Sequence, residues 1–387
     1  MNTARILVIA VAATGIALLT LQAAALPIQS PDEILWLERC ADAWPHQWRT
    51  IYEFKWAWDI GQVNRWAGGA ALWLTGNRDS SQWPTAWRVE GWKIYVGEEY
   101  LLPRYTNMER FHRLHGRGLT WESLMTLRVT NLLFFAAALM ALYASARMIL
   151  RHRGLAMLCV LPFVTGTYWA TRWATVPQSG DTQLMCFSSL ALWVWLRQIK
   201  AGTELSRHSI LILAAVIGLA IASKQTGVML LLAYAGRLAW RSRGGGRLAR
   251  PAMACFIGIL VFVIVNPVYA IFPDIAFTEF VAARVLSAQM RIMREGPLGA
   301  AEFLRLTIAW WPLFPLCGVL AWRRRTQWWA GVLVLWAGVP ALGQFGTMMH
   351  MEIYHRAYMA PIEWGTLMAI GILVLSDCPA SCGHRQA

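Results

Sequence analysis

Long apolar segments, repeated along most of the chain, constrain the fold more than any other feature of this sequence. They cover about residues 6–26, 124–150, 155–171, 184–196, 210–223, 227–240, 251–272, 304–322, 328–348 and 357–375. A helix of roughly 20 apolar residues crosses a hydrocarbon core of about 30 Å. A soluble protein could not bury the surface of a chain that is 57% hydrophobic and 14% charged. The sequence therefore predicts an all-α, polytopic membrane protein with about ten spans.

Basic residues fall in alternate connections between these segments, which predicts the orientation of the chain. Lys and Arg concentrate on the cytoplasmic side of membrane proteins. Arg5 precedes the first segment, and the later basic residues are Arg151, Arg153, Arg197, Lys200, Arg207, the run 237–250 and Arg323, Arg324 and Arg325. This alternation places both termini in the cytoplasm and makes residues 376–387 a short cytoplasmic tail. It also explains the net charge of +14 through orientation and contact with anionic membrane lipids, so we exclude nucleic acid as a partner.

The first apolar segment has two interpretations. Ala23, Ala24 and Ala25 offer small residues where a signal peptide could be cleaved. However, residues 6–26 form a longer apolar run than the roughly 7–15 residues of a signal-peptide core. We therefore expect a retained helix and a single membrane domain over residues 1–375.

The polar connections on the predicted outer side carry the ionisable residues. They are residues 27–122, 172–183, 224–226, 273–303 and 350–356. Residues 27–122 hold eleven of the chain's 23 tryptophans, and Trp prefers the membrane–water interface. We expect short interfacial helices in this first loop, and several short spans that stop early to line a cavity.

Acids and cations occur together on this outer side. Asp32 and Glu33 follow the first span directly, at the depth of the lipid headgroups, where ionisable groups are functional candidates. The candidate residues are Asp32, Glu33, Lys55, Asp59, Arg172, Asp181, Lys224, His350, His355 and Arg356. A carboxylate can accept a proton from an acceptor hydroxyl, and cations can stabilise a departing phosphate. The combination indicates transfer of a sugar from a lipid phosphate.

The order of these motifs resembles the GT-C superfamily of membrane glycosyltransferases over residues 5–375. The resemblance is to the branch of lipid A aminoarabinose transferases and protein O-mannosyltransferases. The similar stretches are Asp32-Glu33 after the first helix, residues 52–55 followed by 66–76, Arg128 opening the second span, residues 172–181, Gly218-Leu219-Ala220 leading to Lys224, and residues 354–358 followed by Pro361. The family's two prolines beside Lys55 are missing, and the spacing from Arg172 to Asp181 is longer than the family's.

The resemblance implies an inner-membrane enzyme that transfers a sugar from a polyprenyl-phosphate-linked donor, with inversion, to an extracytoplasmic lipid, glycan or protein. It implies Asp32 as general base, with Glu33 and Asp181 as further catalytic acids. Lys224, Arg172 and Arg356 would bind the phosphate. Lys55, Asp59 and His355 complete the substrate-binding set. The sequence does not decide whether a divalent metal ion is a cofactor. Acids at a membrane face can hold one, but some family members need none.

Plainer explanations exist for several of these residues. Asp32 and Asp181 could be helix N-caps. Lys224 and Arg172 could simply extend their long side chains to the lipid headgroups, as Lys and Arg near the ends of spans often do. The seven cysteines form no CxxC or Cys/His cluster, so neither a disulfide framework nor a zinc site is predicted. A transporter or flippase of a lipid-linked or small anionic substrate is the alternative function, although no internal repeat supports it. A membrane scaffold without chemistry is the third alternative.

Overall fold

We describe the protein from a computed structural model of the 387-residue chain. The structure describes residues 36–37, 40–41, 62–77, 122–150, 152–165, 180–242, 246–271, 313–348 and 368–376, with isolated positions 15, 43, 244 and 273. All regular elements within these residues are helices. This confirms the predicted all-α class for the described part of the chain.

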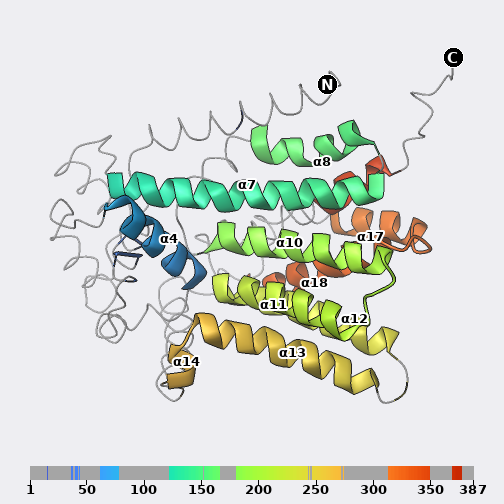
Figure 1. Ribbon diagram of the computed structural model, residues 1–387. Helices are drawn as coiled ribbons and strands as arrows, with labels where there is room; N and C mark the ends of the chain where they lie inside the picture. The colour runs from blue at the N-terminus through green and yellow to red at the C-terminus, as the bar shows by residue number, and fades with distance from the viewer. Residues whose placement is uncertain are drawn as a thin grey trace, which may run out of the picture.

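The long helices lie side by side in a row. They are α7 (Glu122–Leu150), α10 (Asp181–Lys200), α11 (Arg207–Ser223) and α13 (Gly246–Val265), as Figure 1 shows. In this row α10 packs against α7 and α11, and α11 packs against α13. The other α-helices of the described residues include α4 (Gln62–Thr75), α8 (Arg153–Thr165), α12 (Val228–Arg241), α14 (Val268–Ile271), α17 (Leu313–Arg323) and α18 (Ala330–Met348).

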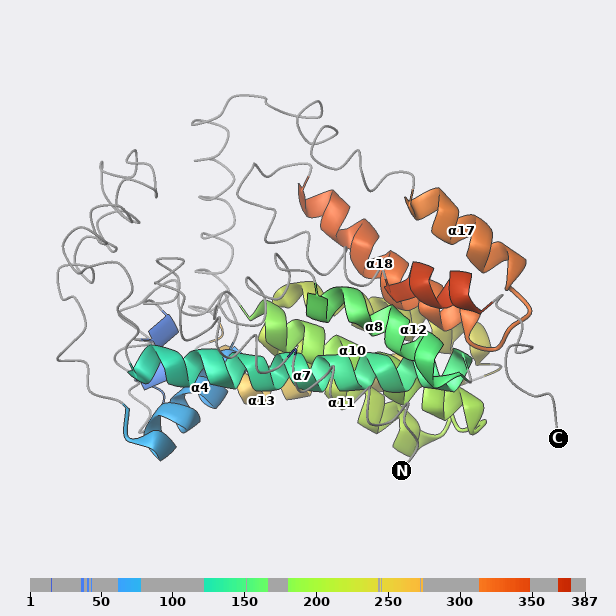
Figure 2. The ribbon, with the colours of Figure 1, turned by 90° about the horizontal axis from the view of Figure 1, so that it is seen from above.

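A second group of helices covers one side of this row. Figure 2 shows α17 and α18 on that side, where α18 contacts both α10 and α12. The indole N–H of Trp336 on α18 donates a hydrogen bond to the backbone carbonyl of Ser188 on α10 at 2.9 Å. Trp336 and Trp195 are both almost fully buried in the apolar core between these helices. The main core is continuous through α7, α8, α10, α11, α12 and α18, and these tryptophans lie where α18 joins it.

A close backbone approach joins α11 to α13. A Cβ atom at Gly218 would lie 2.7 Å from the carbonyl oxygen of Gly258 and 2.7 Å from Cβ of Val261. Only glycine fits at this crossing without moving a backbone atom. This gives the Gly218-Leu219-Ala220 stretch, singled out by resemblance, a packing role immediately before Lys224.

Membrane crossing can be judged by length and composition for two of the described helices. Glu122–Leu150 and Arg247–Val265 are long and apolar enough to span a bilayer, whereas Arg207–Ser223 and Ala330–Val339 are apolar but shorter. The second candidate span exposes large apolar side chains such as Phe256 and Ile264, as expected of a helix that faces lipid. The total of about ten spans and the outer first loop stay predictions.

Several predicted boundaries were wrong. The segment predicted at 184–196 is α10, which begins at Asp181 and continues to Lys200, because polar residues extend the helix beyond its apolar part. The segment predicted at 251–272 begins at Gly246 and ends at Val265, and α14 follows it. Pro267, which lacks an N–H group, separates these two helices.

Candidate functional site

Asp181 and Lys224 form an ion pair where α10 begins and α11 ends. Their side chains are only 2% and 8% exposed. Both helices bring these residues to the same end because the connection of α10 to α11, residues 201–206, turns the chain back at the other end. The structure thus joins two of the residues that the sequence singled out separately.

The local backbone explains where Asp181 lies. Gly180 precedes it with φ of 73°, in the left-handed region that favours glycine, and it occupies the N-cap position of α10 without any side-chain cap. Asp181 is therefore the first helical residue, and the alternative that it is the N-cap of a helix starting at Thr182 is wrong. The predicted outer connection 172–183 likewise ends before Asp181, so this carboxylate stands on a helix.

The backbone after α11 returns tightly and fixes Lys224. The Gly227 N–H donates to the Lys224 carbonyl at 2.9 Å, closing a short turn, η3 (Gln225–Gly227). A Cβ atom at Gly227 would lie 2.7 Å from backbone atoms of Ala220 and Ile221. Lys224 is buried and paired with a carboxylate, so the explanation that it only reaches toward headgroups is wrong.

Further buried polar residues surround the start of α10. Gln183, in the first turn of α10, donates from Nε2 to Oδ1 of Asn64 on α4 at 3.0 Å and to Oδ1 of Asn131 on α7 at 3.1 Å. Arg128 lies one turn before Asn131 and is fully buried, and Arg65 beside Asn64 is 3% exposed. Three helices, α4, α7 and α10, therefore contribute polar or charged side chains at this end, and Lys224 joins them directly after α11.

A glycine lets α4 come close enough to take part. A Cβ atom at Gly68, one turn after Asn64, would lie 2.6 Å from Sγ of Cys40 and 2.7 Å from Cδ2 of Leu127 on α7. The indole N–H of Trp66 donates to the Val265 carbonyl at the end of α13 at 2.8 Å. These contacts hold α4 across the ends of α7 and α13.

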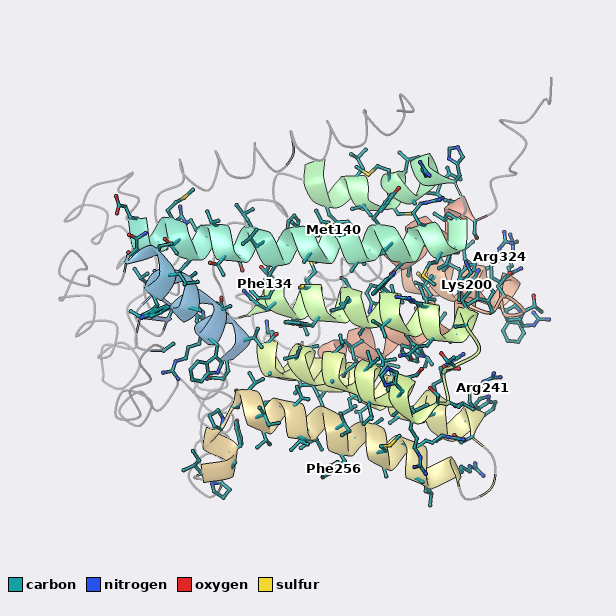
Figure 3. The ribbon with its side chains drawn as sticks, viewed as in Figure 1. Phe134, Met140, Lys200, Arg241, Phe256 and Arg324 are labelled. Atoms are coloured by element: carbon teal, nitrogen blue, oxygen red, sulfur yellow. The ribbon has the colours of Figure 1, made fainter. Side chains whose placement is uncertain are left out.

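The opposite end of the bundle is basic. Figure 3 shows Lys200, Arg241 and Arg324, which come from α10, α12 and the connection after α17, together at that end. There the buried Glu204 accepts a hydrogen bond from Nε of Arg237 and, at 3.0 Å, from the indole N–H of Trp195. The bundle thus carries its basic connections at one end and the Asp181–Lys224 pair at the other.

Most of the candidate residues lie outside the described part of the chain: Asp32, Glu33, Lys55, Asp59, Arg172, His350, His355 and Arg356. Their roles stay predictions. Among the residues that the structure describes, no three His, Cys, Asp or Glu side chains lie close enough together to hold a metal ion.

Sequence reasoning did not single out the three amides, Asn64, Asn131 and Gln183, or the burial of Arg65. A signal was present for Asn131, which lies inside the predicted apolar segment 124–150. Polar residues within such segments usually face the interior of a helix bundle. Gln183 was the last residue of the predicted connection 172–183, and Asn64 lay in a polar loop where amides are ordinary.

The described bundle combines a buried ion pair and buried amides with two helices that are long and apolar enough to cross a membrane. Residues 118–271 match the model of the dolichyl-phosphate-mannose-protein mannosyltransferase family, which is of the GT-C type. This match indicates a membrane glycosyltransferase of the mannosyltransferase type and confirms the predicted GT-C resemblance over those residues. Arg128, Asp181 and Lys224 all lie within it. No curated protein matches the chain significantly.

Proposed function

We propose that this protein transfers a sugar from a polyprenyl-phosphate-linked donor to a hydroxyl group of an extracytoplasmic lipid, glycan or protein. The observation that carries the proposal is the buried Asp181–Lys224 pair, which lies inside the matching residues 118–271 and at the end of the bundle away from the basic connections. A buried cation at that end suits a phosphate that enters from the lipid headgroup region. An ammonium group has three N–H donors, so its pair with Asp181 does not by itself exclude a phosphate oxygen.

The proposed reaction divides the work between two carboxylates. The acceptor hydroxyl oxygen attacks the anomeric carbon, its proton passes to the carboxylate of Asp32, and the bond from that carbon to the phosphate oxygen breaks. The polyprenyl phosphate leaves with the bonding electrons, and attack from the opposite side inverts the anomeric configuration. Lys224 stabilises the charge on the departing phosphate. Asp181, already in contact with Lys224, holds the ammonium group in place.

Donor use tests the proposal directly. We expect the purified full chain in lipid nanodiscs to release polyprenyl phosphate from polyprenyl-phosphate mannose when an envelope extract supplies acceptors. A nucleotide-linked mannose should give no transfer, because it offers no lipid phosphate at the membrane. Release of the lipid phosphate is measured by thin-layer chromatography with radiolabelled donor. Transfer from the nucleotide sugar would contradict the proposal. Movement of the intact donor lipid across a vesicle membrane without cleavage would also contradict it and would favour a transporter.

Orientation is a separate expectation that rests on the clustering of basic connections at one end. We expect a reporter fused after Arg243 to report the cytoplasm and a reporter fused at Trp83 to report the outer side of the inner membrane. Paired alkaline phosphatase and fluorescent protein fusions at both positions measure this. A cytoplasmic signal at Trp83 would place the acids of the first loop on the wrong side for an extracytoplasmic acceptor.

A further inference from the structure

Three buried amide side chains from three helices meet near the ion pair. Gln183 on α10 donates from Nε2 to both Asn64 on α4 and Asn131 on α7. Their exposed fractions are 0%, 3% and 1%. The site is therefore assembled by the packing of α4, α7 and α10 and is closed to bulk water.

Two polar atoms of this group have no hydrogen-bond partner. One is a donor, Nδ2 of Asn64, and the other is an acceptor, Oε1 of Gln183. Buried polar groups in proteins are nearly always hydrogen-bonded, and leaving one unpaired costs free energy. The vacant donor and the vacant acceptor belong to two amides that already share a hydrogen bond, so a single group that both accepts and donates is the simplest partner for the two atoms.

We propose that Asn64 and Gln183 form a fork that binds one hydroxyl group of the donor sugar. A hydroxyl oxygen accepts from Asn64 Nδ2 while its O–H donates to Gln183 Oε1. A phosphate dianion has no hydrogen to donate to Gln183, and an ammonium group has no lone pair to accept from Asn64. The identification of this hydroxyl as part of the donor sugar rests on the proposed function.

The position of the fork suits a sugar joined to a phosphate. Gln183 follows Asp181 by two residues, which is about 3 Å along a helix axis, and Asp181, Thr182 and Gln183 are all buried. These side chains leave the first turn of α10 in different directions, with Asp181 toward α11 and Gln183 toward α4 and α7. To use both groups, a sugar phosphate would lie across the start of α10, with its phosphate at Lys224 and one ring hydroxyl at the fork.

The test compares donor sugars that lack one hydroxyl each. We offer polyprenyl-phosphate mannose and its single-deoxy analogues to the full chain in nanodiscs and measure kcat/KM for each. In the unmodified protein one analogue should lose at least about tenfold, the effect of one lost hydrogen bond in a buried site. Gln183→Ala and Asn64→Ala should lower kcat/KM for the full sugar by a similar factor and abolish the preference against that same analogue.

Two further variants keep the test sharp. Gln198→Ala is the matched control, because Gln198 stands at the other end of α10, donates from Nε2 to the Ser209 carbonyl and also has an unpartnered Oε1. It should leave the preference among donor analogues unchanged. Asn64→Asp keeps the oxygen that accepts from Gln183 Nε2 but removes the N–H donor of Nδ2. It therefore tests the fork even if Asn64→Ala fails to fold.

Two results would overturn the fork. The first is an unchanged preference among deoxy analogues in Gln183→Ala and Asn64→Asp, which would make the amides a structural clasp filled by water. The second result concerns the case in which no polyprenyl-linked donor supports transfer. In that case the proposed function fails, and the fork needs a test that does not depend on transfer. The fork is then judged by thermal stabilisation with methyl mannoside, which should be present in the unmodified protein and Gln198→Ala and lost in Gln183→Ala. No stabilisation of the unmodified protein would reject it.

Discussion

Asp32→Asn should reduce sugar transfer by about 10²–10⁴-fold, the range typical of losing a general base, while the protein still folds and inserts. The amide keeps the shape of the carboxylate and part of its hydrogen bonding, but it cannot take the proton of the acceptor hydroxyl. Asp32 follows the first apolar segment by a few residues, and we therefore predict that it lies at the depth of the donor phosphate. The measurement is single-turnover transfer by purified protein, with insertion checked by membrane fractionation.

Glu33→Gln is the neighbouring control for this prediction. We expect a smaller loss, because Glu33 is proposed to bind or orient the substrate and not to accept the proton. Near-normal transfer by inserted Asp32→Asn protein would show that Asp32 is not the base. Asp181 is then the next candidate, and its contact with Lys224 would acquire a catalytic meaning.

The Asp181–Lys224 pair should show strong coupling between its two residues. Removing one partner of a buried pair leaves an uncompensated charge, which costs about 3–5 kcal/mol. We therefore expect Asp181→Asn and Lys224→Met each to lower the free energy of unfolding by about this amount. The double variant should lose much less than their sum, since it leaves no buried charge. Denaturant titration in detergent micelles measures the four proteins.

Donor binding should not recover in the Asp181/Lys224 double variant, even though its stability does. Lys224→Ala and the double variant should require more donor lipid, because one charge-assisted hydrogen bond to the phosphate is worth about 1.5–3 kcal/mol, roughly a 10- to 150-fold change in donor KM. The control is Glu204 and Arg237, the partly buried ion pair at the opposite end, whose double variant should leave donor KM unchanged. An unchanged KM in Lys224→Ala would remove Lys224 from the phosphate site.

The sequence alone predicted the helical class and the approximate place of most described helices. This was possible because a long apolar segment indicates a helix that is buried in lipid or in the protein core. It failed at helix ends, because Asp181, Thr182 and Gln183 are polar and were assigned to a connection, whereas hydrogen bonds to other helices and the turn at Gly180 make them helical. Periodicity carries no information about such tertiary partners.

The candidate site was predictable only in part, because the sequence pattern does not show which residues meet in the folded protein. Asp181 and Lys224 were both singled out from their order along the chain, but their pairing depends on α10 and α11 running antiparallel with a short turn. The amides Asn64, Asn131 and Gln183 come from three separate segments. Their meeting follows from the glycine contact that brings α4 against α7, which the residue types did not reveal.

The antiparallel arrangement of α10 and α11 bears on how the chain enters the bilayer during synthesis. An unpaired charged residue in a segment that inserts into the membrane is costly, most of all near the middle of the helix. Asp181 leaves the ribosome first, and its partner follows only after the whole of α11 has been made. If both helices span the membrane as predicted, they gain from entering the translocon as one hairpin, in which the opposite charges cross together and neutralise each other. On the predicted topology, insertion as a pair would thus be a second consequence of placing these two charges at the ends of consecutive helices.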